Sequence, residues 1–311
     1  MSLALEVIKL KKRYGGFHLD ISFSIESGET LAIVGANGAG KTTLIQAIQN
    51  LIRRDGGDVR FFGLDLDPDE TKIKQRLGVF LEDPRLFAEI SVENLLKFYR
   101  PFYPSWDSEY ALRLLQEFEV DPGSRFKRLS KGMKVKVALT LALAPRPSML
   151  ILDEPTSGLD PKMRRLFVEK VKEARRLFSP AILLTSHIMR DVEDLADHIA
   201  FLDKGRIRLL ESRFGLQSWR VVEGLCERGL PFNPGRLRFK VEGESIAFKL
   251  LADDYGDSLL EQLEDYGAVV TGVSTPDLEE IYDWVMRGEA TAEAEISSLK
   301  LERQERRTEF S

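Results

Sequence analysis

The feature that most constrains this chain is a glycine-rich stretch at residues 35–43, which reads GANGAGKTT. It contains the pattern G-x-x-x-x-G-K-[ST], and it lies between the apolar run 31–34 and a segment with helical character that begins near Lys41. Glycines suit such a loop because its backbone N–H groups must turn inward around an anion. The N-terminus of the following helix directs its partial positive charge at the same anion. The pattern therefore predicts an α/β core that binds phosphate groups.

Two side chains complete this predicted cradle. Lys41 can reach the β- and γ-phosphates of a nucleotide, and the Thr42 hydroxyl can hold Mg²⁺. A merely flexible glycine loop is the alternative, but it would not explain why strand, helix and Lys-Thr pair occur together. The loop residues predicted to bind the nucleotide are Gly35, Asn37, Gly38, Ala39, Gly40, Lys41, Thr42 and Thr43.

An apolar run that ends in two acids follows downstream, at residues 149–154, MLILDE. Asp153 at the strand end can bind Mg²⁺ directly or through water. Glu154 can point elsewhere and orient an attacking water. Alone, the pair could be exposed acids after a core strand, but the phosphate loop upstream favours the catalytic interpretation.

His187 directly follows another predicted strand, AILLTS at residues 181–186. Ligands of parallel α/β sheets gather at the carboxyl ends of the strands. A histidine there could donate a hydrogen bond to a γ-phosphate. His18 and His198 lack this context and are interpreted as structural or surface residues.

The order of the predicted elements divides the chain into parts. An α/β domain that carries the phosphate loop is expected over residues 1–212, with a mostly helical insertion at about 84–147, an α+β domain over 213–288 and a charged tail over 289–311. Predicted strands of the first domain are 31–34, 59–62, 77–81, 150–152, 182–185 and 199–202, and predicted helices of its insertion are 92–99, 108–118 and 132–143. For the second domain, the pattern predicts strands 236–240, 246–250 and 268–273 and helices 258–266 and 277–286.

Composition narrows the possible functions. The 311 residues include 50 acids and 45 bases, a net charge of −5, which disfavours a strongly basic nucleic-acid binder. A single cysteine, Cys226, excludes an intrachain disulfide. No apolar run approaches the roughly 18–20 residues that cross a bilayer, and the first residues lack the order of a secretory signal. Any membrane span is therefore expected from another chain.

Two further motifs make the sequence resemble a known protein family. LSKGM at residues 129–133 precedes the MLILDE run, and SGLD at 157–160 follows it. Together with the phosphate loop and His187, they resemble the signature, D-loop and switch of the nucleotide-binding subunits of ABC transporters, over about residues 1–212. The resemblance implies a P-loop NTPase core: a RecA-like parallel sheet, an N-terminal antiparallel β part and a helical insertion. A small C-terminal α+β domain would follow.

The resemblance also implies an ATPase mechanism. Two subunits would pack head to tail around two ATP molecules, each on one chain's phosphate loop. The partner's Ser130 and the backbone at Gly132 would cap the γ-phosphate, and Asp160 would link the two sites. Glu154 would be the catalytic carboxylate and His187 the γ-phosphate sensor.

An aromatic near the start of the chain matches the residue that stacks on adenine in this family. Tyr14 holds that position, and Phe17 is a substitute.

Three residues depart from the family's pattern. Lys131 stands where glycine is common and Met133 where glutamine is common. Glu82, in GVFLEDP at residues 78–84, stands in place of the usual glutamine. A glutamate there would bind Mg²⁺ more strongly but repel a nearby γ-phosphate. We expect Glu82 to keep the metal contact.

A subgroup resemblance follows from LSKGMK, from Glu82 and from STPDLEEIYDW at residues 274–284. These resemble bacterial subunits that pair with membrane permeases in drug, antibiotic-peptide or lipid export. The implied partners are a polytopic permease and a second ATP-binding subunit, with a homodimer expected and no nucleic acid. The implied location is cytoplasmic, on the inner face of the cell membrane.

The alternative function is a soluble ABC-type ATPase acting on nucleic acid or ribosomes. One phosphate loop, no sustained heptads and an acidic composition weigh against it. A P-loop kinase or GTPase does not account for LSKGM.

The aromatic stretch FYRPFYPSW at residues 98–106 has two equal interpretations. It is either a surface for the membrane partner or local core packing.

Overall fold

The computed structural model describes residues 2–80, 89–226, 236–242, 245–253 and 255–287. Glu82 and the predicted tail, 289–311, lie outside the described residues. The chain forms two compact units, Met1–Leu210 and Glu211–Ser311.

The centre of the first unit is a six-stranded sheet with the order β10-β9-β3-β8-β7-β6. Neighbouring strands from β9 through β6 run parallel. Its strands are β3 (Thr30–Val34), β6 (Leu77–Phe80), β7 (Met149–Asp153), β8 (Ala181–Ser186), β9 (His198–Asp203) and β10 (Arg206–Ser212). The central strands β3 and β8 are buried along their whole length, because both faces of the sheet are covered. This explains why their sequences read as continuous apolar runs.

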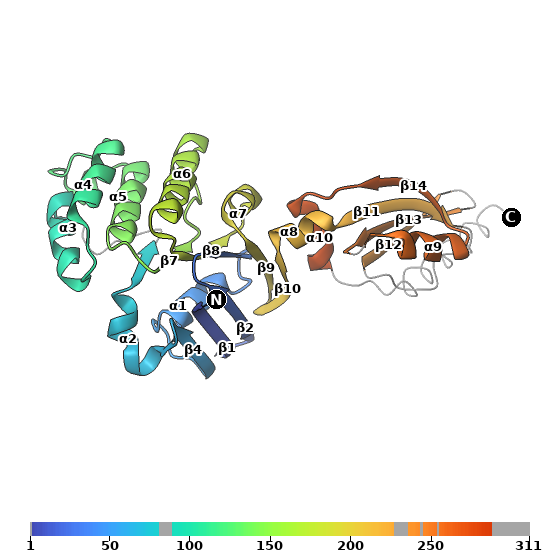
Figure 1. Ribbon diagram of the computed structural model, residues 1–311, viewed down its shortest axis with the longest axis horizontal. Coiled ribbons are helices and arrows are strands. Elements are labelled where there is room, and N and C mark those ends of the chain that lie inside the picture. Colours follow the sequence, from blue (N-terminus) through green and yellow to red (C-terminus); the bar gives the residue numbers. More distant parts are fainter. Residues whose placement is uncertain (1, 81–88, 227–235, 243–244, 254, 288–311) are drawn as a thin grey trace. The chain divides into compact units, whose positions relative to one another are not determined.

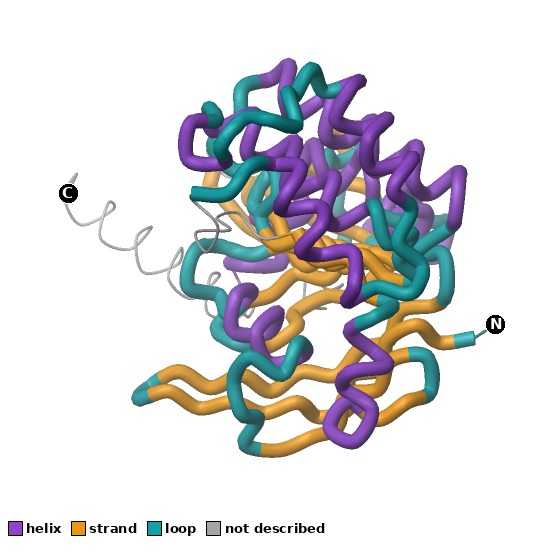
Figure 2. Tube along the Cα trace, turned by 90° about the vertical axis from the view of Figure 1, so that its left-hand side faces the viewer, coloured by secondary structure: helices purple, strands orange, loops and turns teal. Residues whose placement is uncertain are grey.

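A second, antiparallel sheet with the order β2-β1-β4-β5 covers one side of the core. Figure 2 shows it as a separate layer. Its elements are β1 (Leu3–Tyr14), β2 (Phe17–Glu26), β4 (Gly56–Phe61) and β5 (Leu64–Asp65), followed by α2 (Leu66–Lys74). Helix α1 (Lys41–Ile48) contacts both β1 and β7. Its buried Leu44 and Ile48 belong to one apolar cluster with side chains from both sheets, so the phosphate loop enters α1 in the middle of the core.

Helices cover the other face of the six-stranded sheet (Figure 1). The insertion supplies α3 (Val92–Tyr99), the short 3₁₀ helix η2 (Arg100–Phe102), α4 (Ser108–Glu117), the 3₁₀ helix η3 (Phe126–Arg128) and α5 (Lys131–Leu143). Each α-helix has a side-chain N-cap, from Ser91, Asp107 and Ser130. Helices α6 (Pro161–Phe178) and α7 (Met189–Leu195) follow β7 and β8.

In its described residues, the second unit is an antiparallel sheet, ordered β12-β13-β11-β14, with three helices. Its elements are α8 (Arg213–Ser218), β11 (Arg220–Cys226), β12 (Arg236–Glu242), β13 (Ser245–Ala252), α9 (Asp257–Asp265), β14 (Val269–Ser274) and α10 (Leu278–Arg287). Leu263 of α9 is fully buried in one cluster with Val222, Phe248 and Leu250 of the sheet. Cys226 lies in the same cluster, as a small buried apolar residue.

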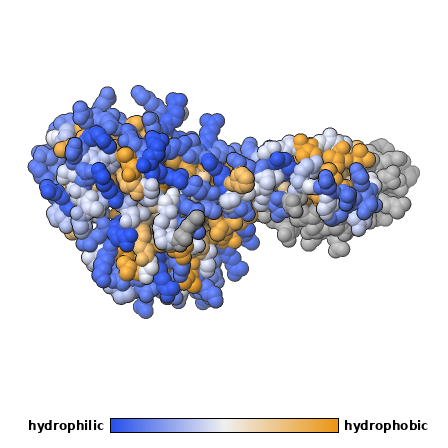
Figure 3. All heavy atoms as spheres, viewed as in Figure 1, coloured by the Kyte–Doolittle hydropathy of each residue, from blue (hydrophilic) through white to orange (hydrophobic). Residues whose placement is uncertain are grey.

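The predicted architecture is confirmed: a parallel core, an N-terminal antiparallel part, a helical insertion and a small C-terminal α+β unit. No helix in the described part of the chain is both long and apolar enough to span a bilayer. The face in Figure 3 is largely hydrophilic, with separate apolar patches.

Candidate functional site

The glycine-rich loop joins β3 to α1 at the carboxyl edge of the six-stranded sheet. Gly40 directly precedes α1 with φ 114°, a conformation that favours glycine. A Cβ at Gly40 would lie 2.7 Å from the Phe17 ring, and one at Gly35 would lie 2.5 Å from the Leu202 carbonyl oxygen. The glycines therefore allow both the turn and the close packing of the loop against its neighbours.

A cavity of about 210 Å³ opens on this loop. It is lined by Phe17, Ala36, Asn37, Gly38, Gly40, Lys41, Thr42, Thr43 and Glu154. The structure thus brings most of the predicted loop residues together with Glu154, which is more than a hundred positions away in the sequence.

Lys41 lies between backbone oxygens and a carboxylate. Its side chain is 6% exposed, and its Nζ donates hydrogen bonds to the carbonyl oxygens of Gly35, at 2.6 Å, and Ala36, at 3.3 Å. Glu154 Oε1 is 3.0 Å from the same Nζ. The ammonium group is therefore held within the loop, where it can interact with bound phosphate.

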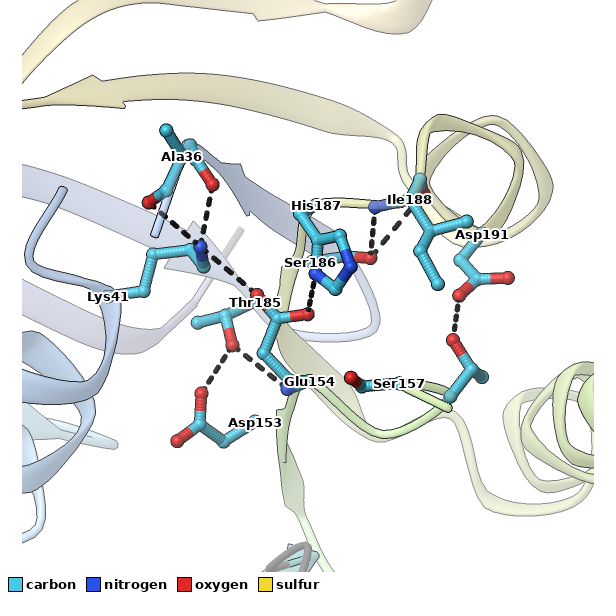
Figure 4. A network of polar contacts seen from close by, with 12 residues as sticks. Ala36, Lys41, Asp153, Glu154, Ser157, Thr185, Ser186, His187, Ile188 and Asp191 are labelled. Carbon is cyan, nitrogen blue, oxygen red and sulfur yellow. Dashed lines mark hydrogen bonds and ion pairs between the residues drawn. The ribbon is translucent and has the colours of Figure 1, made fainter. Parts of the chain in front are cut away.

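Glu154 directly follows β7 and contacts Lys41, Thr185 and His187 (Figure 4). Its backbone N–H donates to Thr185 Oγ1 at 3.1 Å, and its Oε2 lies 2.6 Å from His187 Nδ1. Its φ is 45°, in the left-handed region that residues other than glycine rarely adopt. This turn of the backbone directs the carboxylate away from β7 and toward Lys41 and His187.

Asp153 and Thr185 are register partners on the neighbouring strands β7 and β8. The Thr185 hydroxyl donates to Asp153 Oδ1 at 2.5 Å and accepts the Glu154 N–H. Thr185 therefore holds both acids, and the sequence analysis missed it. Its only sequence signal is its place at the end of a buried strand, because strand register cannot be deduced from the sequence.

Three predicted site residues, Ser130, Gly132 and Asp160, lie at helix N-termini and do not line this cavity. Ser130 caps α5 by accepting the Met133 N–H at 3.3 Å, and Asp160 caps α6 by accepting the N–H groups of Lys162 and Met163 at 2.9 and 3.0 Å. Gly132 is in the first turn of α5, where an added Cβ would lie 3.6 Å from Met163 of α6.

Lys131, one of the departures from the family pattern, contacts the SGLD segment of its own chain. Its Nζ is 3.4 Å from the Ser157 carbonyl oxygen. A Cβ at Gly158 would lie 2.7 Å from the same Nζ. The Lys131 amine therefore lies over the backbone of this segment.

Tyr14 and Phe17 face each other across the turn between β1 and β2, as register partners. Phe17 lines the cavity, whereas Tyr14 is 48% exposed and its ring lies 5.0 Å from Lys12 Nζ. Of the two aromatics, Phe17 therefore lines the cavity within one chain, and Tyr14 lies beside it on the neighbouring strand.

Comparison with known proteins agrees with this geometry. The sequence model of the ABC transporter family matches residues 19–157. The ABC transporter ATP-binding protein YtrB of Bacillus subtilis is 33% identical over 205 residues, which cover 64% of this chain and 68% of YtrB. The Nod factor export ATP-binding protein I of Rhizobium johnstonii is 31% identical over 296 residues, covering 90% of this chain and 94% of that protein.

A solved structure described as the ATP binding subunit of an ABC transporter shares the fold. It is 30% identical, superposes with a TM-score of 0.63, and covers 69% of this chain and 92% of its own length. Sequence, geometry and comparisons thus agree: the chain belongs to the ATP-binding subunits of ABC transporters, the ATPases that power transport.

Proposed function

We propose that this chain hydrolyses ATP at the cavity on residues 35–43, with Glu154 as the catalytic carboxylate. The observation that supports the proposal is the placement of Glu154 between Lys41 and His187, at 3.0 and 2.6 Å. In the reaction, a water oxygen attacks the γ-phosphorus while the bond to the β–γ bridging oxygen breaks. Glu154 orients that water and accepts its proton, a contribution of about 10²–10⁴-fold for general base catalysis.

His187 positions the carboxylate and senses the γ-phosphate. When its Nδ1–H donates to Glu154, the other ring nitrogen of a neutral imidazole is an acceptor. The ring can therefore donate to a phosphate from Nε2 only as imidazolium, or from Nδ1 after leaving Glu154. Either change alters the contact between His187 and Glu154, so phosphate binding and the position of the carboxylate are linked.

The oxygen donors at the site suit Mg²⁺. Thr42 offers a hydroxyl at the start of α1, and Asp153 offers a carboxylate oriented by Thr185. In the described residues, no three His, Cys, Asp or Glu side chains are grouped to hold a metal. Mg²⁺ would therefore take its other ligands from nucleotide oxygens and water. Bound Mg²⁺ neutralises charge on the β- and γ-phosphates. The metal contact of Glu82 stays a prediction.

Two copies of the chain would form the working ATPase. Ser130, Gly132 and Asp160 lie at the N-termini of α5 and α6 and do not line the cavity of their own chain. We assign them to the nucleotide of a second copy, as the resemblance implies. The helix N-terminus at Ser130 suits a γ-phosphate because its N–H groups carry partial positive charge.

The transport direction is proposed to be export, from the inner face of the cell membrane through a separate permease. The support is the relative named for Nod factor export, whose similarity extends over 90% of this chain and so includes most of the second unit. On the insertion, Phe98 and Phe102 are 49% and 57% exposed with ring centroids 5.5 Å apart. We assign these two aromatics to the surface that meets the permease.

The experiment that tests the ATPase proposal is solution mass by light scattering on Glu154→Gln, with and without MgATP. This substitution removes the charge of the catalytic group but leaves the loop intact. We expect ATP to double the mass and hydrolysis to fall by at least about 10²-fold. ATP binding without a doubling would refute a homodimer, and absence of ATP binding would refute the site. Copurification with ribosomes rather than a polytopic membrane protein would contradict the transport role.

A further inference from the structure

A buried polar cluster lies beside the ATPase site, centred on Asp191 of α7. Asp191 is 1% exposed. Its Oδ2 accepts a hydrogen bond from the hydroxyl of Thr156, which is 3% exposed, and its Oδ1 accepts one from Arg164 Nε at 2.5 Å. None of these three residues lines the cavity on the phosphate loop.

The contact between Thr156 and Asp191 closes a ring with the contact between Glu154 and His187. Figure 4 shows the Glu154–His187 contact and Asp191 on the following helix. Thr156 follows Glu154 by two residues, and Asp191 follows His187 by four. The side chains of Glu154 and His187 meet at one end of the two segments, and those of Thr156 and Asp191 meet at the other. The carboxylate, the histidine and the intervening backbones are thereby held as one closed unit.

Arg164 extends this unit to the end of the SGLD segment. It lies in the first turn of α6, and its backbone N–H donates to the carbonyl oxygen of Asp160 at 3.0 Å. Asp191 thus holds the SGLD segment from both sides, through Thr156 directly before it and through Arg164 in the helix that follows it. Between them, the Leu159 N–H donates to the Thr156 carbonyl oxygen at 3.1 Å, which keeps the segment compact.

Joining α6 to α7 does not by itself require a buried carboxylate. Lys172 of α6 and Asp194 of α7 already join the same two helices at 2.6 Å, with side chains 40% and 51% exposed. Burying Asp191 carries a desolvation cost that an exposed pair avoids, and apolar residues could fill the same space. The buried cluster adds a defined geometry: because the Asp191 carboxylate accepts from both Thr156 and Arg164, it fixes the positions of these two side chains relative to each other.

We propose that Asp191 is a positioning residue of the ATPase: it fixes the Thr156–Asp160 segment relative to His187. A displacement of His187 on phosphate binding is then transmitted through α7 to the segment that carries Asp160. This inference rests on the proposed function, since it assumes that Glu154 and His187 act on ATP.

The test compares Thr156→Val, which removes the hydroxyl and leaves charge and volume nearly unchanged, with Thr156→Ser, which keeps the hydroxyl. We expect Thr156→Val to lower kcat roughly tenfold to hundredfold, as expected when a reacting group is misplaced by about 1 Å. KM for ATP should stay within about twofold, because the variant does not alter the contacts of Lys41. Thr156→Ser should restore most of kcat.

A second arm uses Asp191→Asn, with Asp194→Asn as the matched control on the same helix. Asp194→Asn should leave kcat and KM unchanged. If Asp191→Asn does not fold, the Thr156 pair still decides the question.

Unchanged kcat in folded Thr156→Val would overturn the proposal, even if its melting temperature falls, because a structural role alone moves only stability. Equal kcat losses in Thr156→Val and Thr156→Ser would also overturn it. If the wild-type chain does not hydrolyse ATP, the proposed function itself fails, and this inference fails with it.

Discussion

Lysine serves two different purposes in the two sheets. At the edge of the parallel sheet, Lys41 is 6% exposed and held between loop carbonyls and Glu154. On the face of the C-terminal sheet, Lys249 is 41% exposed and bridges Glu223, at 3.1 Å, and Glu280 of α10, at 3.0 Å. Both lysines meet carboxylates, but of the two only Lys41 borders the cavity on the glycine-rich loop.

The difference follows from strand direction. Parallel strands all end at the same edge, so the chain segments that follow β3, β7 and β8 converge there, with Lys41, Glu154 and His187. Antiparallel strands end alternately at both edges, and in the described part of the C-terminal unit Lys249 meets its two carboxylates on the face of the sheet. Charged side chains at a common strand end can act together on a ligand, whereas charged side chains on the face of a sheet mainly keep that face solvated.

The largest effect is expected in the core of the C-terminal unit. Leu263→Ala should lower the unfolding free energy of this unit by about 2–5 kcal/mol, since Leu263 is fully buried. Urea denaturation measures the loss, and ATP hydrolysis below the transition should not change. A fall in kcat would break the comparison, because the second unit would then take part in the chemistry.

The next effect separates the two lysines. Lys41→Met should weaken ATP binding about tenfold to hundredfold, or roughly 1.5–3 kcal/mol for a hydrogen bond to a charged group. Lys249→Met makes the same change on the other sheet and should leave ATP affinity unchanged. Titration calorimetry on both variants decides, and equal affinities would contradict the assignment of Lys41.

Thr185→Val compares a threonine at the carboxyl end of a parallel strand with one in the antiparallel C-terminal sheet. It removes the hydroxyl that binds Asp153 and Glu154, at a cost of about 0.5–1.5 kcal/mol in the transition state, or roughly twofold to tenfold in kcat. Thr271→Val, at an exposed position of β14, is the matched control and should have no effect. Steady-state ATPase rates test the pair.

The smallest effect concerns Lys249 and pH. Hydrogen bonding to Glu280, aided by Glu223 and opposed by burial, raises the pKa of Lys249 above its ordinary 10.5. The bridge therefore stabilises the unit fully below about pH 10.5 and is lost as pH rises through the raised pKa. Because the side chain is partly exposed, Lys249→Met should cost only about 0.2–1 kcal/mol. Urea denaturation at pH 8 and 11 should show the difference shrinking at the higher pH, and a constant difference would contradict the bridge.

Much of the fold could be predicted because its signals are local. The helices of the insertion begin after Ser91, Asp107 and Ser130, all good N-caps, and their predicted ranges differ from the observed ones by only a residue or so. Strand β11 was not predicted as a strand, because its partners β13 and β14 lie later in the chain. Exposed Glu223 and the small Gly224 also interrupt its apolar pattern.

Only those site residues that belong to a sequence motif could be predicted. The phosphate loop, Glu154 and His187 stand in recognisable patterns, but their distances depend on strand register. Thr185 was missed for this reason, and Asp191 was missed because its partners, Thr156 and Arg164, lie far away in the sequence. Asp191 had one usable signal: it shares a helical face with Leu195, four residues on, so a carboxylate falls on the buried side of α7.

The alignment of Asp153 with Thr185 on neighbouring strands also limits where the chain can accept insertions. One residue added inside β7 or β8 would move the following side chain by about 3.3 Å and turn it to the opposite face of the sheet. A residue added where the chain enters these strands, at 145–148 or 179–180, can be absorbed by a loop. A single added residue should therefore be tolerated better at the entering end of the sheet than at the leaving end, where Asp153 and Thr185 lie.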